Sequence, residues 1–279
     1  MLVCFAHPDD ESFFAGGTIA KYAKNGWEIR LIVASDGEKG DNAVNPEVTG
    51  EALGILRQEE VRKAAGVLGI TEVAFLHQKD GGLADLSSGT LEDMIIEKME
   101  TFFPQVVITH DPSGVTNHPD HIKVSYATTF AFQKYTQHAE MLKNPKAFEG
   151  KRGKGWLEAE AQEVFTGVDP ETFEPKLYFS CVSESIVTYL QKNKQFPEEA
   201  HGKPVTGTPD KLISAVIDIS KTKLVKGKAL LCHETQREEV DRFISFPNHP
   251  LAEHEDFMLR MVGTTEAFMG KNDRVKSLL

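Results

Sequence analysis

The sequence is poor in cysteine, and its cysteines form no pattern that predicts a disulfide framework or a thiolate metal site. There are three among 279 residues (Cys4, Cys181 and Cys232), far apart and never spaced as Cys-x-x-Cys. An odd number of isolated cysteines is typical of proteins from a reducing compartment. We therefore expect a cytoplasmic protein with neither structural disulfides nor a cysteine-ligated zinc ion.

The sequence also lacks an excess of positive charge and long hydrophobic runs. Its net charge of −11 argues against a nucleic-acid-binding surface, which needs clustered lysine and arginine. No apolar run approaches the length of a membrane span, and the first residues lack the basic segment, apolar core and cleavage site of a signal peptide. We expect no nucleic-acid partner and no membrane span, while the composition leaves an oligomer open.

Short apolar runs alternate with longer amphipathic segments through the first half of the chain. The runs are rich in β-branched or aromatic residues and end at polar or glycine-containing loops, as strands do. We predict strands at residues 2–6, 28–35, 72–76 and 105–109, and helices at residues 15–25, 51–68 and 90–103. This alternation predicts a doubly wound, mostly parallel sheet with helices on both faces, a Rossmann-like α/β fold. Gly16 and Gly17 do not complete the dinucleotide pattern G-x-G-x-x-G, so we attribute them to close packing of the first helix against the sheet.

The second half of the chain departs from this alternation. A helix is expected from about residue 120 to 138, but residues 139–175 mix proline, glycine and both signs of charge. Such a stretch indicates a long surface excursion rather than a linker. Two strands and a helix then form a C-terminal extension, at residues 176–182, 214–219 and 221–232. We expect a single domain spanning residues 1–279.

Two clusters of histidine and carboxylate follow predicted strands. The segment His7–Glu11 (HPDDE) follows the first strand, and His118–His121 (HPDH) comes shortly after the fourth. In the common strand order 3-2-1-4-5, strands one and four flank the crevice in which doubly wound folds bind ligands. By itself the first segment would also fit the N-cap of a helix beginning near Phe13. The prediction of a shared site therefore depends on the second cluster, His118–His121. We expect the two clusters to meet.

Imidazole and carboxylate side chains together suit a metal ion. Catalytic zinc usually has three such protein ligands and one open position, although Fe²⁺ or Mn²⁺ also binds two histidines and a carboxylate. Zinc lowers the pKa of bound water to about 7, and a neighbouring carboxylate is able to take up the proton. Asp9 and Asp10 can divide the roles of base and ligand, because consecutive side chains point in different directions. We expect Glu11 to hold the loop by hydrogen bonds and Asp120 to orient a histidine.

The two motifs carry a family resemblance. In context they are AHPDDESFFAGGTIA and GVTNHPDHI, which resemble the LmbE-like or PIG-L family of metal-dependent N-deacetylases that act on N-acetylglucosamine derivatives. The likeness extends through RQEEVRKAAGVLG (residues 57–69), DGGL (80–83) and KALLCHETQ (228–236). It therefore spans most of the chain.

The resemblance implies a role for each matching residue. The zinc ligands would be His7, Asp10 and His121. Asp9 would be the general base, and His118 would stabilise the oxyanion or protonate the leaving amine. Arg57 and Asp80 fall where family members contact the sugar. Some sugar-thiol precursor deacetylases have tyrosine two residues before the first histidine of the second motif; here Thr116 stands there, so we expect a substrate other than the mycothiol precursor.

These features predict a zinc-dependent hydrolase that removes an acetyl group from a small N-acetylglucosamine-containing molecule. The alternatives are a zinc amidase that cleaves a larger amide, such as a sugar-thiol conjugate, and a non-catalytic metal- or sugar-binding protein. A phosphoesterase would often need a second metal ion. We expect a polar site rim from residues 36–50 and 77–83, suited to sugar hydroxyls rather than to a lipid or aromatic group. Histidines outside the motifs are expected to be incidental, among them His77, His110, His249 and His254.

Overall fold

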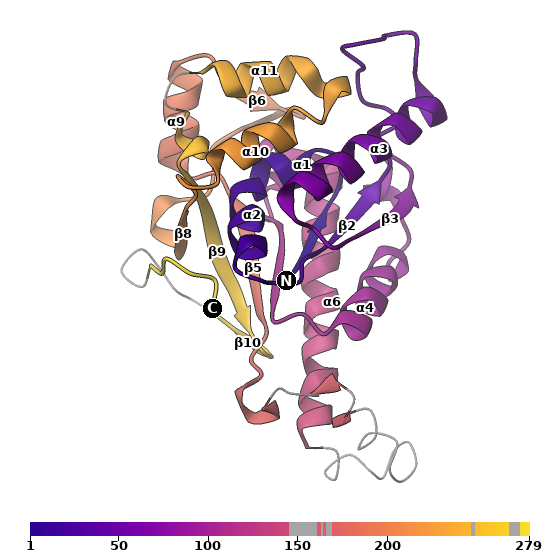
Figure 1. Cartoon of the computed structure of the whole chain (residues 1–279), viewed down its shortest axis with the longest axis vertical. Coiled ribbons are helices and arrows are strands. Elements are labelled where there is room, and N and C mark those ends of the chain that lie inside the picture. The colour runs from indigo at the N-terminus through magenta and orange to yellow at the C-terminus, as the bar shows by residue number, and fades with distance from the viewer. Residues whose placement is uncertain (145–160, 163, 166–168, 247–248, 268–273) are drawn as a thin grey trace.

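A computed structural model shows an α/β fold built on one large sheet (Figure 1). It describes residues 1–144, 161–162, 164–165, 169–246, 249–267 and 274–279. The strands lie in the order β10 (Thr265–Glu266), β9 (His254–Val262), β5 (Lys176–Cys181), β4 (Val106–His110), β1 (Leu2–Phe5), β2 (Arg30–Ser35) and β3 (Glu72–Gln78), and β8 (Ala215–Asp218) pairs with β9. Strands β5, β4, β1, β2 and β3 are parallel, whereas β9 runs antiparallel to β5. The predicted strand order and the Rossmann-like fold are confirmed.

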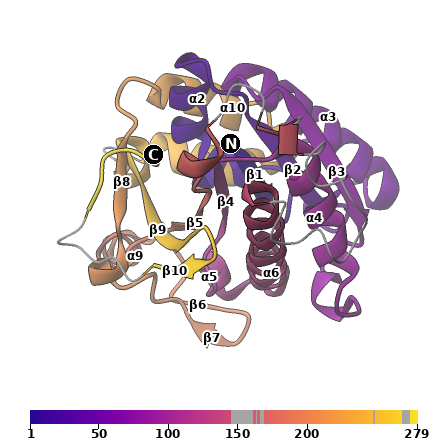
Figure 2. The ribbon, with the colours of Figure 1, turned by 90° about the horizontal axis from the view of Figure 1, so that it is seen from below.

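Helices cover both faces of this sheet. They are α1 (Asp10–Phe14), α2 (Gly16–Lys24), α3 (Gly50–Leu68), α4 (Thr90–Phe102), α5 (Gly114–Asn117), α6 (Pro119–Lys143), α9 (Glu184–Lys192), α10 (Lys223–Leu230) and α11 (Arg237–Ser245). Short 3-10 helices are η1 (Leu83–Asp85), η2 (Pro170–Thr172), η3 (Asp210–Leu212), η4 (Glu234–Gln236) and η5 (Pro250–Ala252), and a small hairpin joins β6 (Glu199–Ala200) to β7 (Lys203–Pro204). Figure 2 shows α4 and α6 on one side of the strands and α2, α3 and α10 on the other.

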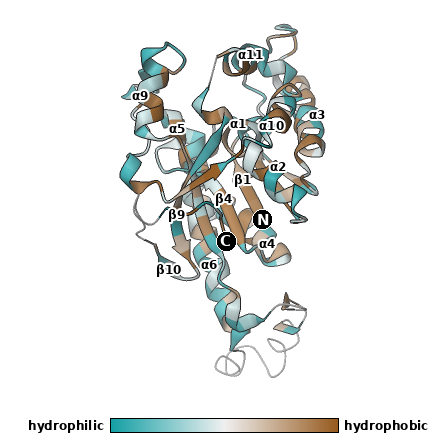
Figure 3. Ribbon diagram, turned by 60° about the vertical axis from the view of Figure 1, so that its left-hand side comes forward, coloured by the Kyte–Doolittle hydropathy of each residue, from teal (hydrophilic) through white to brown (hydrophobic). Residues whose placement is uncertain are grey.

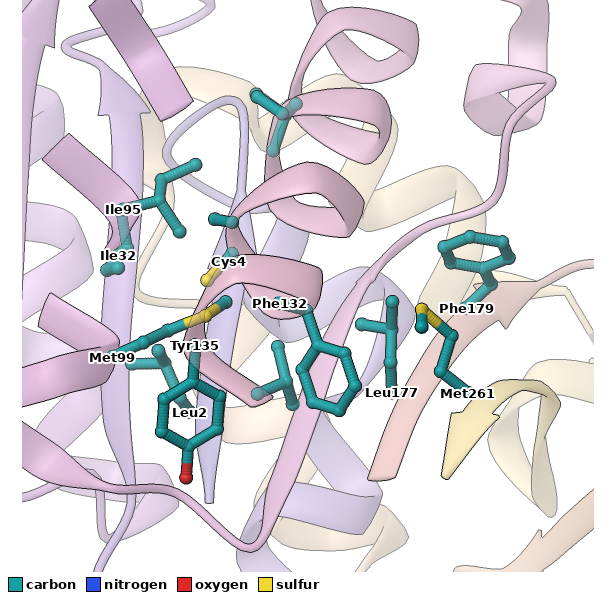
Figure 4. Close-up of a cluster of buried hydrophobic side chains, with 14 of the residues drawn as sticks. Leu2, Cys4, Ile32, Ile95, Met99, Phe132, Tyr135, Leu177, Phe179 and Met261 are labelled. Atoms are coloured by element: carbon teal, nitrogen blue, oxygen red, sulfur yellow. The ribbon is translucent and has the colours of Figure 1, made fainter. Parts of the chain in front are cut away.

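The alternation of side chains along β1 divides the core into two layers. Leu2 and Cys4 are buried with the side chains of α4 and α6, whereas Val3 and Phe5 are buried with those of α2, α3 and α10. Consecutive residues of a strand point to opposite faces, so one buried strand supplies both layers. Figure 4 shows the first layer, in which Leu2 and Cys4 lie beside Ile95 and Met99 of α4. In Figure 3 the strands β1 and β4 are accordingly hydrophobic along their length.

Two helix boundaries differ from the sequence prediction. The helix expected at residues 15–25 begins at Gly16 as α2, and the separate short helix α1 precedes it, because Ala15 leaves helical geometry (φ −143°) between the two. The helix expected to end at residue 138 continues to Lys143, since Ala139 and Leu142 bury apolar surface on its inner face. The predicted excursion at 139–175 therefore begins later, and most of it lies outside the described residues.

Strand β9 was not predicted, because it begins with three ionisable residues, His254, Glu255 and Asp256. Glu255 is 2% exposed and accepts hydrogen bonds from the backbone N–H groups of Gly17 (2.9 Å) and Thr18 (2.8 Å) at the start of α2. Its other contact is Lys226 Nζ at 2.7 Å. A carboxylate that is saturated in this way is tolerated inside a strand.

The predicted close packing at Gly17 is confirmed. A Cβ atom at this position would lie 2.5 Å from Ile219 Cδ1 and 2.7 Å from Ile219 Cβ. Glycine therefore lets α2 approach the end of β8. Among the described residues, no helix combines the length and apolar character that a membrane span requires.

Candidate active site

The loop after β1 places one carboxylate in an unusual position. Asp9 is the N-cap residue of α1, so this helix starts three residues before the predicted Phe13. Its φ of 108° is rare for a residue with a side chain, and its carboxylate makes no capping bond. Instead Asp9 Oδ2 accepts from Arg57 Nη2 at 3.0 Å. The side chain that would ordinarily cap the helix is therefore available to the site.

Ligand-type atoms of three residues converge from the two predicted clusters. His7 Nδ1 lies 3.0 Å from His121 Nε2, Asp10 Oδ1 lies 3.4 Å from His121 Nε2, and Asp10 Oδ2 lies 3.7 Å from His7 Nδ1. A tetrahedral ion with bonds of about 2.1 Å would separate its ligands by about 3.4 Å. All three residues are less than 10% exposed. The donor set and its spacing thus fit a single zinc-sized cation.

Hydrogen bonds from the outer ring nitrogens support this arrangement. His121 Nδ1 lies 3.1 Å from the carbonyl oxygen of Gly114, an acceptor, so the proton of the neutral ring sits on Nδ1 and leaves the Nε2 lone pair free. His7 Nε2 lies 3.2 Å from Asp80 and 3.4 Å from Asp120 carboxylate oxygens. Histidine ligands of metals are usually oriented by such partners. Both rings therefore present one nitrogen toward Asp10.

The carboxylates behind His7 are themselves fixed by backbone groups. Asp120 accepts hydrogen bonds from Gly81 N at 2.7 Å and Leu83 N at 3.1 Å. Asp80 accepts from Lys39 N at 3.0 Å. The structure thus places Asp120 in the orienting position that the sequence predicted. Asp80, expected to contact a sugar, shares that position while it also lines the pocket.

His110 is a part of this cluster that the sequence prediction missed. It is the last residue of β4, fully buried, and its ring stacks on that of His121 with centroids 4.0 Å apart. Its Nε2 lies 3.2 Å from Asp10 Oδ2. The expectation that His110 is incidental was wrong. The available signal was its position at the carboxyl end of strand four, where ligand-contacting residues gather.

His118 stands at the N-terminus of α6, where its geometry fixes its tautomer. Its Nδ1 accepts the backbone N–H of Asp120 at 3.2 Å, so the proton of the neutral ring is on Nε2. Burial and the neighbouring His7 lower the pKa of His118. The two ring centroids are 4.7 Å apart. His118 thus offers a neutral N–H donor beside the ligand-type atoms.

Several groups of three side chains in this region have metal-ligand spacing. In three overlapping groups the ligand atoms lie within 4.8 Å of one another. The groups are His7, His118 and His121; Asp10, His110 and His121; and His7, Asp80 and Asp120. Every group contains His7 or His121. These two histidines are therefore the centre of the cluster.

The adjacent carboxylates of Asp9 and Asp10 have opposite environments. Burial raises the pKa of both, but the charges of His121, His110 and His7 outweigh it at Asp10 and hold its pKa far below the usual range. At Asp9 burial prevails over the opposing charge of Arg57 and raises the pKa to about 7. Burial lowers the pKa of His121 well below the usual value. Burial also lowers that of His7, but hydrogen bonds to Asp120 and Asp80 outweigh it and raise the pKa to about 10.

Arg57 is buried, and its guanidinium group forms hydrogen bonds with other residues of the protein. It is 4% exposed, and besides Asp9 it donates from Nη2 to Pro8 O at 2.6 Å and from Nη1 to Gly37 O at 2.9 Å. Glycine at position 37 (φ 70°) is required here, because a Cβ atom would lie 2.6 Å from Arg57 Nη1. The contact of Arg57 with a sugar remains a prediction, although Arg57 lines the pocket.

The C-terminal part of the chain supports the first loop from behind. His233 Nε2 lies 2.8 Å from Glu11 Oε1, and Glu11 Oε2 accepts from Asp9 N at 3.1 Å. Both side chains are at most 1% exposed. Two residues on, Thr235 donates to the Glu60 carboxylate from its backbone N (2.8 Å) and its hydroxyl (2.6 Å). The predicted structural role of Glu11 is confirmed, with His233 as a partner that the sequence did not reveal.

The cluster opens into a pocket of about 810 Å³. The loops expected to form a polar rim supply Lys39, Gly40, Asp80 and Gly81. The apolar wall of the pocket includes Phe13, Phe14, Val182, Leu190, Phe196, Phe243 and Leu251. The expectation of a rim without an apolar slot was therefore wrong, because it considered only loops that follow parallel strands. His249, expected to be incidental, also lines this wall.

Comparisons with known proteins agree with the motifs. The PIG-L family model, described as GlcNAc-PI de-N-acetylase, matches residues 2–132. A 1D-myo-inositol 2-acetamido-2-deoxy-alpha-D-glucopyranoside deacetylase of Mycobacteroides abscessus is 30% identical over 270 residues, which cover 85% of this chain and 81% of that enzyme. The enzyme of the same name from Rhodococcus jostii is 28% identical over 268 residues, with the same coverage of 85% and 81%.

Solved structures share the fold at lower identity. An N,N'-diacetylchitobiose deacetylase from Pyrococcus horikoshii has a TM-score of 0.58 at 18% identity and covers 92% of this chain and 82% of its own. A 4-carboxy-2-hydroxymuconate hydratase from Pseudomonas putida has a TM-score of 0.59 at 18% identity, with coverage of 95% and 98%. The fold thus carries more than one reaction, and the family assignment depends on the sequence relatives and the two motifs. On these grounds the chain belongs to the PIG-L family of de-N-acetylases.

Proposed function

We propose that the chain is a zinc-dependent hydrolase that removes the acetyl group from a small N-acetylglucosamine-containing molecule. The observation that carries this proposal is the division between Asp9 and Asp10. Asp10 lies among histidine nitrogens and keeps its charge, whereas burial raises the pKa of Asp9 to about 7. Neighbouring carboxylates whose pKa values are pushed apart are typical of a site that needs one ligand or electrostatic group and one proton acceptor.

His7, Asp10 and His121 would hold the ion, and their spacing supports this set. When bound, zinc lowers the pKa of a water molecule and polarises a carbonyl group. Asp9, with a pKa near neutrality, takes the proton as the water attacks the amide carbon. His118 donates its Nε2–H to the oxyanion that develops on the substrate. Asp9 then returns the proton to the leaving nitrogen, so that acetate and a free amine are released.

Relatives with sequence similarity are named for deacetylation of an acetamido-glucopyranosyl inositol. We propose the same class of amide here, because Asp9 and His118 supply what an unactivated amide requires: a proton for the leaving amine and a donor to the oxyanion. Thr116 lines the pocket where some sugar-thiol precursor deacetylases carry tyrosine. That the substrate differs from the mycothiol precursor stays a prediction.

The test combines metal analysis with an amine-release assay on N-acetylglucosaminides and simple acetamides. We expect about one transition-metal ion per chain, lost in His7→Ala and His121→Ala but kept in His77→Ala, a control histidine that is largely exposed. Asp9→Asn should keep the metal and lose activity by about 10²- to 10⁴-fold, whereas Asp10→Asn should weaken metal binding.

Three outcomes would each contradict a part of the assignment. Undiminished metal in both histidine variants would remove them from the ligand set. Metal loss in Asp9→Asn but not in Asp10→Asn would exchange the two carboxylate roles. Turnover of simple acetamides as fast as of the sugars would exclude a sugar site.

A further inference from the structure

The far half of the pocket has a composition that amide hydrolysis does not explain. It is lined by α9 and the segment after it, with Leu190, Lys194 and Phe196, and by α11, with Arg242 and Phe243. These elements lie beyond the segment that matches the family model, residues 2–132. They sit at the same end of the molecule as α1 (Figure 1). This half therefore faces whatever is attached to the reacting sugar.

Within the part of the chain that the structure describes, the pocket lining includes cations without an ion-pair partner. At the near half, Asp9 is paired with Arg57 at 3.0 Å, and Asp80 lies 3.2 Å from His7. Among the described residues, Lys194 and Arg242 have no carboxylate within ion-pair distance, although both line the pocket. In a chain with a net charge of −11, such a location for two free cations favours an anionic ligand.

Lys39, near Asp80 on the opposite side, is a third cation without an ion pair among the described residues. Glu239, one turn before Arg242, is the acid that lines the far half in the described part of the chain. Three unpaired cations thus stand against one unpaired acid. Cations therefore outnumber acids among the charged side chains of the pocket lining that have no ion-pair partner in the described part of the chain.

The wall between these cations is aromatic. The Phe13 and Phe243 rings meet edge to face with centroids 5.7 Å apart, and the Phe243 and His249 rings lie 4.1 Å apart. Phe13 and Phe243 are each partly exposed, whereas His249 is buried. Partly exposed aromatic faces next to cations suit a flat or apolar group that carries negative charge.

We propose that this far half binds the aglycone of the substrate, and that the aglycone is an apolar or aromatic body carrying a carboxylate or phosphate. The proposal depends on the proposed N-deacetylase function for its reaction. Lys194 and Arg242 would contact the anion, while Phe243 and Phe196 would pack against the body. Anion recognition would then come from the C-terminal extension rather than from the motif loops.

The test compares glucosaminides that differ in the aglycone alone. The probes are methyl, phenyl, 4-carboxyphenyl, 4-(phosphonooxy)phenyl and 4-(aminomethyl)phenyl N-acetylglucosaminide, as both anomers, and kcat/KM is measured for each. Exposed ion pairs contribute roughly 0.2–1 kcal/mol each, so two cations should favour an anionic over a plain phenyl aglycone by about 2- to 30-fold. The preference should shrink at high salt. The carboxylate and phosphate probes distinguish the two sources of charge.

Variants identify the groups responsible. Lys194→Gln combined with Arg242→Gln should bring the anionic-to-phenyl ratio close to one. Lys192→Gln is the control, because Lys192 is the last residue of α9, two positions before Lys194, is exposed and does not line the pocket; it should keep the wild-type ratio. Phe243→Ala should reduce the preference for phenyl over methyl.

Failure of this proposal is separable from failure of the proposed function. Turnover of all glucosaminides without preference for anionic aglycones would overturn the aglycone site and leave the deacetylase standing. If no glucosaminide is turned over by metal-loaded protein, the deacetylase proposal fails. Calorimetric titration with the phenyl and 4-carboxyphenyl glucosaminides then tests the aglycone site by itself. Tighter binding of the 4-carboxyphenyl compound, with this difference lost in the double variant, supports the site. Equal binding of the two compounds refutes it.

Discussion

Replacing Arg57 by glutamine should move the pH dependence of activity. Arg57 Nη2 lies 3.0 Å from Asp9 Oδ2, and both side chains are at most 14% exposed. Burial raises the pKa of Asp9 to about 7 even though the guanidinium charge of Arg57 lowers it. A cation at this distance typically lowers a carboxyl pKa by about 1–3 units. Its removal should therefore raise the pKa of Asp9 by about 2 units, or about 2.7 kcal/mol.

The sign of the effect follows from the role of Asp9 as a base. Activity requires the carboxylate, so it falls as pH drops through the pKa of Asp9. With a pKa near 7, about half of the molecules carry the carboxylate at pH 7, and after a rise of about 2 units about one in a hundred does. The Arg57→Gln variant should lose activity about 50-fold at pH 7 and recover most of it above pH 9. Arg57→Lys keeps a positive charge and should shift the profile much less.

The assay is the pH profile of kcat/KM for amine release, which reports groups of the free enzyme. Chemical denaturation of both variants is measured alongside, since breaking a buried ion pair destabilises proteins by about 3–5 kcal/mol. If the fall in kcat/KM at low pH occurs at the same pH in a folded, metal-containing Arg57→Gln protein, a group other than Asp9 is responsible for that fall. Asp9 would then not be the base.

Two further predictions concern contacts that support the site and the fold. His233→Ala leaves Glu11 without its 2.8 Å partner and should lower kcat by about 10- to 100-fold with metal content unchanged. His233→Gln retains a hydrogen-bond donor and should keep part of the activity. Equal kcat in the wild type and both variants would exclude a positioning role for His233. Gly17→Ala places a Cβ atom 2.5 Å from Ile219 and should destabilise the protein by about 1–3 kcal/mol. Gly66→Ala, where no atom lies within 4 Å, should instead be neutral or stabilising in denaturant unfolding, and similar losses in both would refute the packing argument.

The order of the parallel strands could be predicted because each carries its own signal. Val106–His110 and Leu2–Phe5 are short, apolar and followed by polar loops, and the handedness of parallel connections leaves few arrangements. Strand β9 gave no such signal. Its Glu255 is stable inside the sheet only because the start of α2 and Lys226 saturate it, and those partners are remote in sequence.

The candidate site likewise has residues that the sequence predicted and residues that it did not. His7, Asp10 and His121 belong to compact motifs at the ends of adjacent strands, so geometry alone predicted their approach. His110 has no motif around it; its position at the end of the fourth strand was the one available signal, and its stacking on His121 shows that it belongs to the cluster. The apolar wall was missed because most of its residues, such as Leu190, Phe196 and Phe243, come from the C-terminal half of the chain, whose path across the pocket is set by tertiary packing rather than by local pattern.

The bond between Glu255 and the start of α2 also bears on the order in which the chain folds. Helix α2 obtains hydrogen-bond acceptors for its first N–H groups from a residue that follows it by about 240 positions, and the hydroxyl of Tyr22 in the same helix accepts the backbone N–H of Leu278 at 2.6 Å. Contacts of such sequence separation form slowly. A ribosome must therefore release nearly the whole chain before α2 is fully stabilised, and the segment that holds the ligand-type residues should remain open until the C-terminal strands have closed over it.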